Sequence, residues 1–212
     1  MDMGPVGAFT ASNLTSGAGS RRPPTDADFV RAIHHGVRTD GSPLVFMPSA
    51  SYAALSAPDL AAVVAYVKSV APVDRQLPPT AIGPIGRVIL TLSPEDFLAA
   101  RRIDHAAPLP APIPPAPTGE YGRYLADIGG CTGCHNPDLK GGRKEGPPGT
   151  PPSADLTSTG PMAQWTEAQF REALRTGIRP DGTTINPFMP WRYTARWTED
   201  EVGAVWAFLR TK

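Results

Sequence analysis

One pattern of residues occurs twice along the chain in the same order, and this repeat restricts the fold more than any other feature. The segment Gly36 to Gly41 has its counterpart in Gly177 to Gly182, and Phe46-Met47-Pro48 has its counterpart in Phe188-Met189-Pro190. The offset is 141 residues between the two glycine segments and 142 between the two methionines. A repeat at a nearly fixed offset predicts two copies of one structural unit, separated by small insertions or deletions.

The repeat divides the chain into two domains joined by a different segment. We expect the first domain at residues 1–71 and the second at residues 119–212. Residues 72–118 are expected to be a proline-rich linker with one short helix, whose start is marked by Ser93-Pro94-Glu95. The run from Pro108 to Pro117 predicts a semi-rigid, extended chain.

Capping residues mark the ends of the expected helices. Thr166 with Gln169, and Thr198 with Glu201, have the spacing of the capping box, in which a hydroxyl and the side chain three residues later satisfy amide groups reciprocally. Gly177 suits the left-handed position after a helix. The other expected helices lie at Thr25 to Gly36, Ala57 to Val70 and Glu120 to Ile128.

The fold class expected from these signals is all-α. Val88 to Leu92 is a weak strand candidate, and strand signals are otherwise scarce. The 26 prolines and 21 glycines predict short helices joined by long irregular loops. Such loops need something to pack on, and a large apolar prosthetic group would complete a core that a small domain cannot fill alone.

The charge balance and hydropathy exclude several classes of partner. Lys and Arg together number 20, as do Asp and Glu, so nothing indicates binding to nucleic acid or to an anionic membrane surface. No apolar run is long enough for a transmembrane helix, and the first twenty residues lack the pattern of a signal peptide. We therefore expect no nucleic-acid partner and no transmembrane segment in this chain.

The two cysteines of the chain lie in the sequence Cys131-Thr132-Gly133-Cys134-His135. In a Cys-x-x-Cys-His motif both thiols can add to the vinyl groups of a haem, and the histidine ligates the iron. A Cys-x-x-Cys pair also suits a redox dithiol or half of a zinc site. A dithiol normally lies in a βαβ context, which is missing, and zinc would need a second ligand pair, which His34, His35 and His105 do not supply by their spacing. The motif favours covalent haem c, with zinc and a dithiol as alternatives.

With these residues the chain resembles the class I bacterial cytochromes c, in particular two-haem periplasmic cytochromes built from tandem domains. The resemblance extends over nearly the whole chain and rests on four features: Tyr121 to Ala126, Cys131 to His135, Asp138 to Gly142, and the Met-Pro pair of each repeat. It implies a periplasmic location. Because the chain lacks an export signal, we expect that its start is either truncated or wrongly assigned.

The resemblance also implies the second iron ligand. In that family a methionine in a late loop ligates the iron, which by position implies Met189, 54 residues after His135. The rival, Met162, precedes the helix beginning near Glu167 and has no counterpart in the first repeat. A Met189 that only packs in the core is the alternative interpretation. Ligation by His and Met raises the reduction potential.

Other residues of the second repeat are candidates for the surroundings of the haem. Aromatic and proline residues that could line the crevice are Pro147, Pro148, Trp165, Trp191 and Tyr193. Arg175 and Arg179 could offset the charge of the haem propionates. For all of these, ordinary packing or solvation is an equal alternative. Trp206, as the resemblance implies, is expected to pack against Gly122 and Leu125.

The first repeat departs from the family because no Cys-x-x-Cys-His motif precedes Met47. At the repeat offset, the missing motif would lie before Met1. We favour the hypothesis that the chain begins inside a longer protein, where a second haem would need an upstream motif and would have Met47 as its candidate ligand. The alternative is a degenerate, haem-free domain that serves as a docking surface, with Met47 in its core.

The expected function is the transfer of single electrons by haem c. A relay between an exported dehydrogenase and a respiratory acceptor fits the tandem arrangement, with a dehydrogenase, an oxidase or another cytochrome as redox partner. One alternative is a haem enzyme that oxidises peroxide or sulfur compounds, which requires an open position on the iron and is disfavoured by Met189. Another is a haem-based sensor or binding module. His34 and His35 fall at a helix end, where a solvated or capping histidine is expected.

Overall fold

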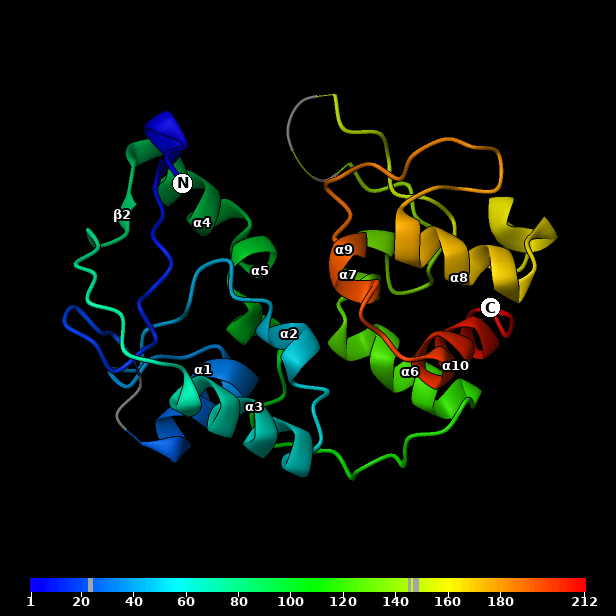
Figure 1. Cartoon of the computed structure of the whole chain (residues 1–212). Helices are drawn as coiled ribbons and strands as arrows, with labels where there is room; N and C mark the ends of the chain where they lie inside the picture. The colour runs from blue at the N-terminus through cyan, green and yellow to red at the C-terminus, as the bar shows by residue number, and fades with distance from the viewer. Residues whose placement is uncertain (23–24, 145, 147–148) are drawn as a thin grey trace. The chain divides into compact units, whose positions relative to one another are not determined.

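A computed structural model describes residues 1–22, 25–144, 146 and 149–212. The chain forms two compact units, an N-terminal unit from Met1 to Pro112 and a C-terminal unit from Ile113 to Lys212 (Figure 1). Each unit is helical, with short helices and long loops. No helix among the described residues is long and apolar enough to cross a membrane.

The C-terminal unit is built around the pair of helices α6 and α10, which pack against each other (Figure 1). Gly122 on α6 permits this contact, because a Cβ atom at this position would lie 1.8 Å from the carbonyl oxygen of Ala204 on α10. The elements of this unit are α6 (Gly119–Ile128), α7 (Cys131–His135), η3 (Pro161–Gln164), α8 (Glu167–Thr176), α9 (Trp191–Thr194) and α10 (Glu199–Leu209).

The core of this unit consists of apolar side chains from α6, α8 and α10 with additions from the loops. Leu139 and Met162 are the loop and 3-10 members of this core. The buried residues of the three helices in it are Tyr121, Tyr124, Leu125, Ala126, Phe170, Leu174, Val202, Ala204, Val205, Phe208 and Leu209. Burial of these side chains stabilises the unit through the hydrophobic effect.

The N-terminal unit combines helices with one short antiparallel pair of strands. Gly7 of β1 is paired with Ile82 of β2, and Ala8 with Ala81. The elements are η1 (Gly4–Val6), β1 (Gly7–Ala8), α1 (Asp26–His35), α2 (Ser49–Tyr52), α3 (Ala57–Ser69), β2 (Ala81–Ile82), α4 (Pro84–Leu92), α5 (Pro94–Phe97) and η2 (Ala99–Arg102).

Val88 to Leu92, the weak strand candidate of the sequence, is helical, because these residues belong to α4. Pro84 occupies the first turn of this helix, where the fixed φ of proline favours a helix start. Gly86, Ile89 and Leu90 line a small hollow together with Phe9 and Phe46. This packing of one helical face overrides the β-propensity of the valine and isoleucine.

The segment expected as a linker contains more structure than the sequence analysis predicted. A helix begins after Ser93 as expected, but β2, α4 and η2 also lie within residues 72–118. These elements contact η1, β1 and α2 and so form part of the N-terminal unit. The boundary between the units falls between Pro112 and Ile113, inside the proline-rich run.

The expected helix caps are present in both units. Thr166 with Gln169 and Thr198 with Glu201 form complete capping boxes. Gly36 and Gly177 adopt the left-handed conformation after α1 and α8, with φ of 66° and 73°.

The turns that follow α1 and α8 have the same geometry. The amide of Leu44 donates to the carbonyl of Gly36 at 2.7 Å, and the amide of Ile185 donates to that of Gly177 at the same distance. Arg38 donates to the carbonyl oxygen of Pro43 at 2.7 Å, and Arg179 to that of Thr184 at 2.8 Å. The sequence repeat is therefore matched by a repeat of local structure.

Candidate haem-binding site

The Cys-x-x-Cys-His motif forms the short helix α7, which follows α6 after a tight turn. Gly130 makes this turn in the left-handed conformation, with φ of 73°, which glycine adopts without steric cost. A Cβ atom at the preceding residue, Gly129, would lie 2.8 Å from the carbonyl oxygen of Leu125 and 3.5 Å from the Trp197 ring. The motif therefore begins directly after α6, at a position set by the turn at Gly130.

The imidazole of His135 is buried and held in one orientation. Its side chain is 8% exposed, and Nδ1 lies 2.7 Å from the carbonyl oxygen of Ala154. Because a carbonyl oxygen only accepts hydrogen bonds, Nδ1 carries the proton and Nε2 keeps its lone pair. A metal-ligating histidine is oriented in this way by a partner on its second nitrogen. The side chain thus presents the atom that an iron ligand requires.

Burial also keeps this imidazole neutral. Desolvation lowers the pKa of His135, and the hydrogen bond to Ala154, which acts in the opposite direction, does not cancel the effect. Only the neutral imidazole has a free lone pair for a metal.

The loop after the motif is fixed by backbone hydrogen bonds. The amide of Gly141 donates to the His135 carbonyl at 2.9 Å, and the Asn136 side chain donates to the Gly141 carbonyl at 2.5 Å. Gly141 has a φ of 67°, and a Cβ atom there would lie 2.3 Å from the Ala154 carbonyl oxygen. The absence of a side chain at Gly141 thus lets Ala154 approach His135.

The cysteines are thiols, as thioether formation requires. Cys131 is half-buried and Cys134 is exposed. Burial, with smaller contributions from Asp127 and Cys134, raises the pKa of the Cys131 thiol to about 11. A redox dithiol works through a thiolate of lowered pKa, so this environment disfavours the dithiol interpretation.

The two candidate methionines have different surroundings. Met162 is buried within the core, in η3. Met189 is only half-buried and packs against the edge of that core, in the loop between α8 and α9. Its amide donates to the Asn186 carbonyl at 2.9 Å, and its carbonyl accepts from the Trp191 amide at 2.8 Å. The backbone of Met189 is therefore fixed while its side chain is not enclosed by the core.

The aromatic residues expected to line the haem crevice behave differently from one another. Trp165 packs against the core, and the Trp191 ring covers Gly177. Tyr193 does not fit the expectation, because it is 74% exposed on α9. Pro147 and Pro148 lie outside the described residues.

The arginines proposed as propionate partners are engaged elsewhere. Arg175 forms an ion pair with Glu199, although its buried Nε has no hydrogen-bond partner. Arg179 is bound within its own turn, to Thr183 and Thr184. Neither contact was predicted from the sequence, because Glu199 lies on a different helix from Arg175 and the turn at Arg179 is defined by its hydrogen bonds.

Trp206 lies on α10, and α10 packs on α6 as expected, but the ring contact of Trp206 is with a residue of α8. The Trp206 ring is 5.4 Å from the ring centre of Phe170 on α8. Gly122 packs against the backbone of Ala204 and Val205 instead. Trp197, which was not predicted from the sequence, precedes the cap Thr198 at the position of a hydrophobic staple and packs against the core.

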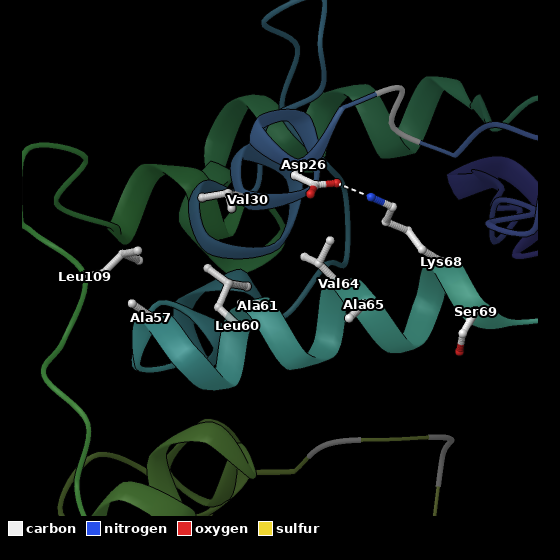
Figure 2. A pocket seen from close by; sticks show the side chains of 10 residues that line it. All are labelled: Asp26, Val30, Ala57, Leu60, Ala61, Val64, Ala65, Lys68, Ser69 and Leu109. Atoms are coloured by element: carbon white, nitrogen blue, oxygen red, sulfur yellow. Dashed lines mark hydrogen bonds and ion pairs between the residues drawn. The ribbon is translucent and has the colours of Figure 1, made fainter.

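The N-terminal unit shows no counterpart of this site among the described residues. Met47 is half-buried, and no three His, Cys, Asp or Glu side chains of the described chain lie together as metal ligands. His34 and His35 lie in the last turn of α1, as expected, but His34 is buried, and the Nδ1 atoms of His35 and His105 lie 3.1 Å apart. A hollow of about 510 Å³ lies between α1 and α3, and none of the residues that line it is an expected haem ligand (Figure 2).

Comparison with known proteins gives the family of the C-terminal unit. Residues 120–212 match the cytochrome c family model. The cytochrome c subunit of a quinone alcohol dehydrogenase from Gluconacetobacter polyoxogenes is 36% identical over 97 residues, which are 42% of this chain and 21% of that protein. The fructose dehydrogenase cytochrome subunit of Gluconobacter japonicus is 33% identical over 104 residues, 45% of this chain and 21% of that subunit.

A third relative is the cytochrome c subunit of a gluconate 2-dehydrogenase from Pantoea cypripedii, 30% identical over 97 residues, 42% of this chain and 22% of that subunit. The chain thus spans about a fifth of the length of these relatives. The family implies a covalently bound haem c, and Cys131, Cys134 and the oriented His135 fit its attachment motif. Residues 120–212 are therefore a class I cytochrome c domain.

Proposed function

We propose that the chain transfers single electrons through a haem c held by Cys131, Cys134, His135 and Met189. The observation that carries the proposal is the hydrogen bond from His135 Nδ1 to Ala154, because it leaves Nε2 available as an iron ligand. The two thiols of α7 would hold the haem covalently, and the iron would supply the reversible one-electron chemistry.

The residues of the chain would tune and protect this group. His135 is oriented and kept neutral by burial and by Ala154. The half-buried Met189 would supply the second protein ligand to the iron, and a thioether ligand favours ferrous iron and raises the potential. With His135 and Met189 both as ligands, the iron would offer no open position for substrate, which favours electron transfer over catalysis.

The proposed redox partner is a dehydrogenase. Support comes from the relatives, which are named as cytochrome subunits of alcohol, fructose and gluconate dehydrogenases. A relay from such an enzyme to a respiratory acceptor, in the periplasm, is the proposed role.

The N-terminal unit is proposed to be a second, cytochrome c-like domain. The turn after α1 has the hydrogen bonds of the turn after α8, and Met47 has the sequence position of Met189. Residues 1–71 would then correspond to part of residues 119–212. Met47 becomes a candidate ligand for a second haem only where polypeptide outside this chain supplies a Cys-x-x-Cys-His motif.

Expression with a haem-attachment system and an export signal tests the proposed function. We expect one covalent haem per chain and a reversible one-electron titration that fits a single midpoint potential. His135→Ala should lose the low-spin spectrum while Cys131 and Cys134 still attach haem. A wild-type chain with no covalent haem, or with a haem that binds peroxide or carbon monoxide without displacement of a ligand, would contradict the proposal.

A further inference from the structure

Helices α3 and α10 correspond in the sequence repeat, but one face that is buried on α10 is exposed to solvent on α3. On α10, Ala204, Val205 and Phe208 are 0%, 3% and 7% exposed. At the offset of 142 residues, the corresponding positions on α3 are Ala62, Val63 and Tyr66. Ala62 is exposed, and Val63 and Tyr66 are 39% and 72% exposed. These three positions lie along one strip of the helix.

The C-terminal unit shows what covers this strip on α10. Helix α6 crosses there, with Gly122 against the backbone of Ala204 and Val205. The neighbours Tyr121 and Leu125 are buried in the same contact region. A small residue at the crossing point lets two helices approach closely. On α3 the crossing position is held by Ala62, as it is by Ala204 on α10, so a helix of the same kind can approach it equally closely.

A second strip of α3 is also less covered than its counterpart. Gly203 on α10 is buried, and a Cβ atom placed on it would lie 3.8 Å from Pro117, in the segment that leads into α6. The corresponding residue on α3, Ala61, is exposed and lines the hollow between α1 and α3 (Figure 2). Helix α3 therefore lacks cover at the positions where α10 contacts both α6 and the segment before it.

We propose that the face of α3 formed by Ala62, Val63 and Tyr66 is a docking site for an amphipathic helix of the α6 kind, provided by polypeptide other than the residues described here. The occupant has a glycine at the crossing point and large apolar side chains beside it, as α6 has Gly122 flanked by Tyr121 and Leu125. Contiguous exposed apolar side chains of this type mark interaction sites. The proposal rests on helix packing alone and does not depend on haem binding by either unit.

The test supplies the chain with a second copy of its own α6. Residues 117–130 are fused ahead of Met1 through a flexible Gly/Ser linker of about 20 residues, which makes docking intramolecular. Amide hydrogen exchange is then measured along α3 by mass spectrometry. We expect exchange in α3 to slow by about tenfold or more relative to the unfused chain.

The matched control fusion carries Gly122→Leu in the added copy only. Leucine favours the helix more than glycine does, so the control peptide is at least as helical but cannot approach α3 closely. We expect no slowing of exchange in this control. On α3, Val63→Asp should abolish the protection, whereas Val88→Asp on α4, at a valine that is also exposed (56% against 39%), should leave it unchanged.

Three results would overturn the proposal. The first is an unfused chain that dimerises through α3 with this face already protected, since the occupant would then be a second copy. The second is equal protection by the Gly122→Leu copy. The third is an α3 that the wild-type copy leaves unprotected while the fused chain retains its native thermal stability.

Discussion

His135 donates its Nδ1 proton to the carbonyl oxygen of Ala154 at 2.7 Å, across a loop of the C-terminal unit. The loop between these residues is folded so that Gly141 lies against Ala154 and its amide bonds the His135 carbonyl. Orientation of the iron ligand is therefore built into the backbone of this loop. A backbone acceptor cannot be removed by substitution, so the contact is best tested through Gly141.

Replacement of Gly141 by Ala should destabilise the site more than replacement of its neighbour Gly142. Both residues have positive φ, 67° and 84°, so both substitutions carry a backbone cost of about 1 kcal/mol. Only at Gly141 would the new Cβ atom meet the Ala154 carbonyl, and nothing lies within 4 Å of one at Gly142. We expect Gly141→Ala to cost about 2 kcal/mol more in the free energy of unfolding than Gly142→Ala.

Denaturant unfolding of the haem-loaded variants, with the midpoint potential as a second measurement, checks this prediction. Gly141→Ala should also shift the potential, because His135 loses its fixed partner. Equal unfolding free energies and equal potentials for the two variants would refute a role for the loop in orienting His135.

The contact between α6 and α10 should tolerate no side chain at Gly122. A Cβ atom there would overlap the Ala204 carbonyl oxygen, so Gly122→Ala should destabilise the C-terminal unit by about 3 kcal/mol. Gly119→Ala is the matched control in the same helix, since its Cβ would make only ordinary contacts with Phe208. Thermal unfolding followed by circular dichroism measures both. Similar melting temperatures would show that the close approach of the two helices is not needed.

Acidification should weaken the N-terminal unit near the end of α1. Burial, followed by the charges of neighbouring histidines, lowers the pKa of both His34 and His35 from 6.5. The unfolded chain then binds protons at a higher pH than the folded chain does. Stability is therefore full above about pH 6.5 and falls as the pH drops toward the lowered values.

Hydrogen exchange of the α1 amides between pH 7.5 and 5, corrected for the intrinsic pH dependence of exchange, follows this loss locally. His34→Leu should flatten the profile, because it removes a buried group that takes up a proton. The substitution breaks no hydrogen bond of the His34 Nδ1 atom, which has no partner. A profile that is equally steep in His34→Leu would assign the acid sensitivity to other groups.

Local signals in the sequence were sufficient for the helix ends and for the attachment motif. Thr198 with Glu201 predicted a capping box, and the structure contains it, because this signal depends on neighbouring residues alone. The weak strand signal at Val88 to Leu92 did not produce a strand, because β-propensity is weaker than packing of the helix against Phe9 and Phe46. The sequence could not show that α9 leaves Tyr193 in solvent, since exposure depends on tertiary contacts.

Contacts between distant residues were the least predictable part of the site. Nothing in the sequence links His135 to Ala154, because a backbone carbonyl carries no residue-type signal. Trp197 could have been found from its place before Thr198, where a hydrophobic staple is common. The partner of Arg175, Glu199, lies in the first turn of α10. This pairing could be predicted only from the relative placement of α8 and α10.

The identity of the second iron ligand tests the account most directly. The measurement is the optical spectrum of the oxidised, haem-loaded chain with Met189→Leu, and Met162→Leu is the matched control. Both substitutions conserve side-chain volume, so the fold should be kept. We predict that Met189→Leu removes the far-red band of methionine-ligated iron and lowers the midpoint potential, while Met162→Leu preserves both. A far-red band that persists in Met189→Leu, or that is lost in Met162→Leu, would contradict the assignment.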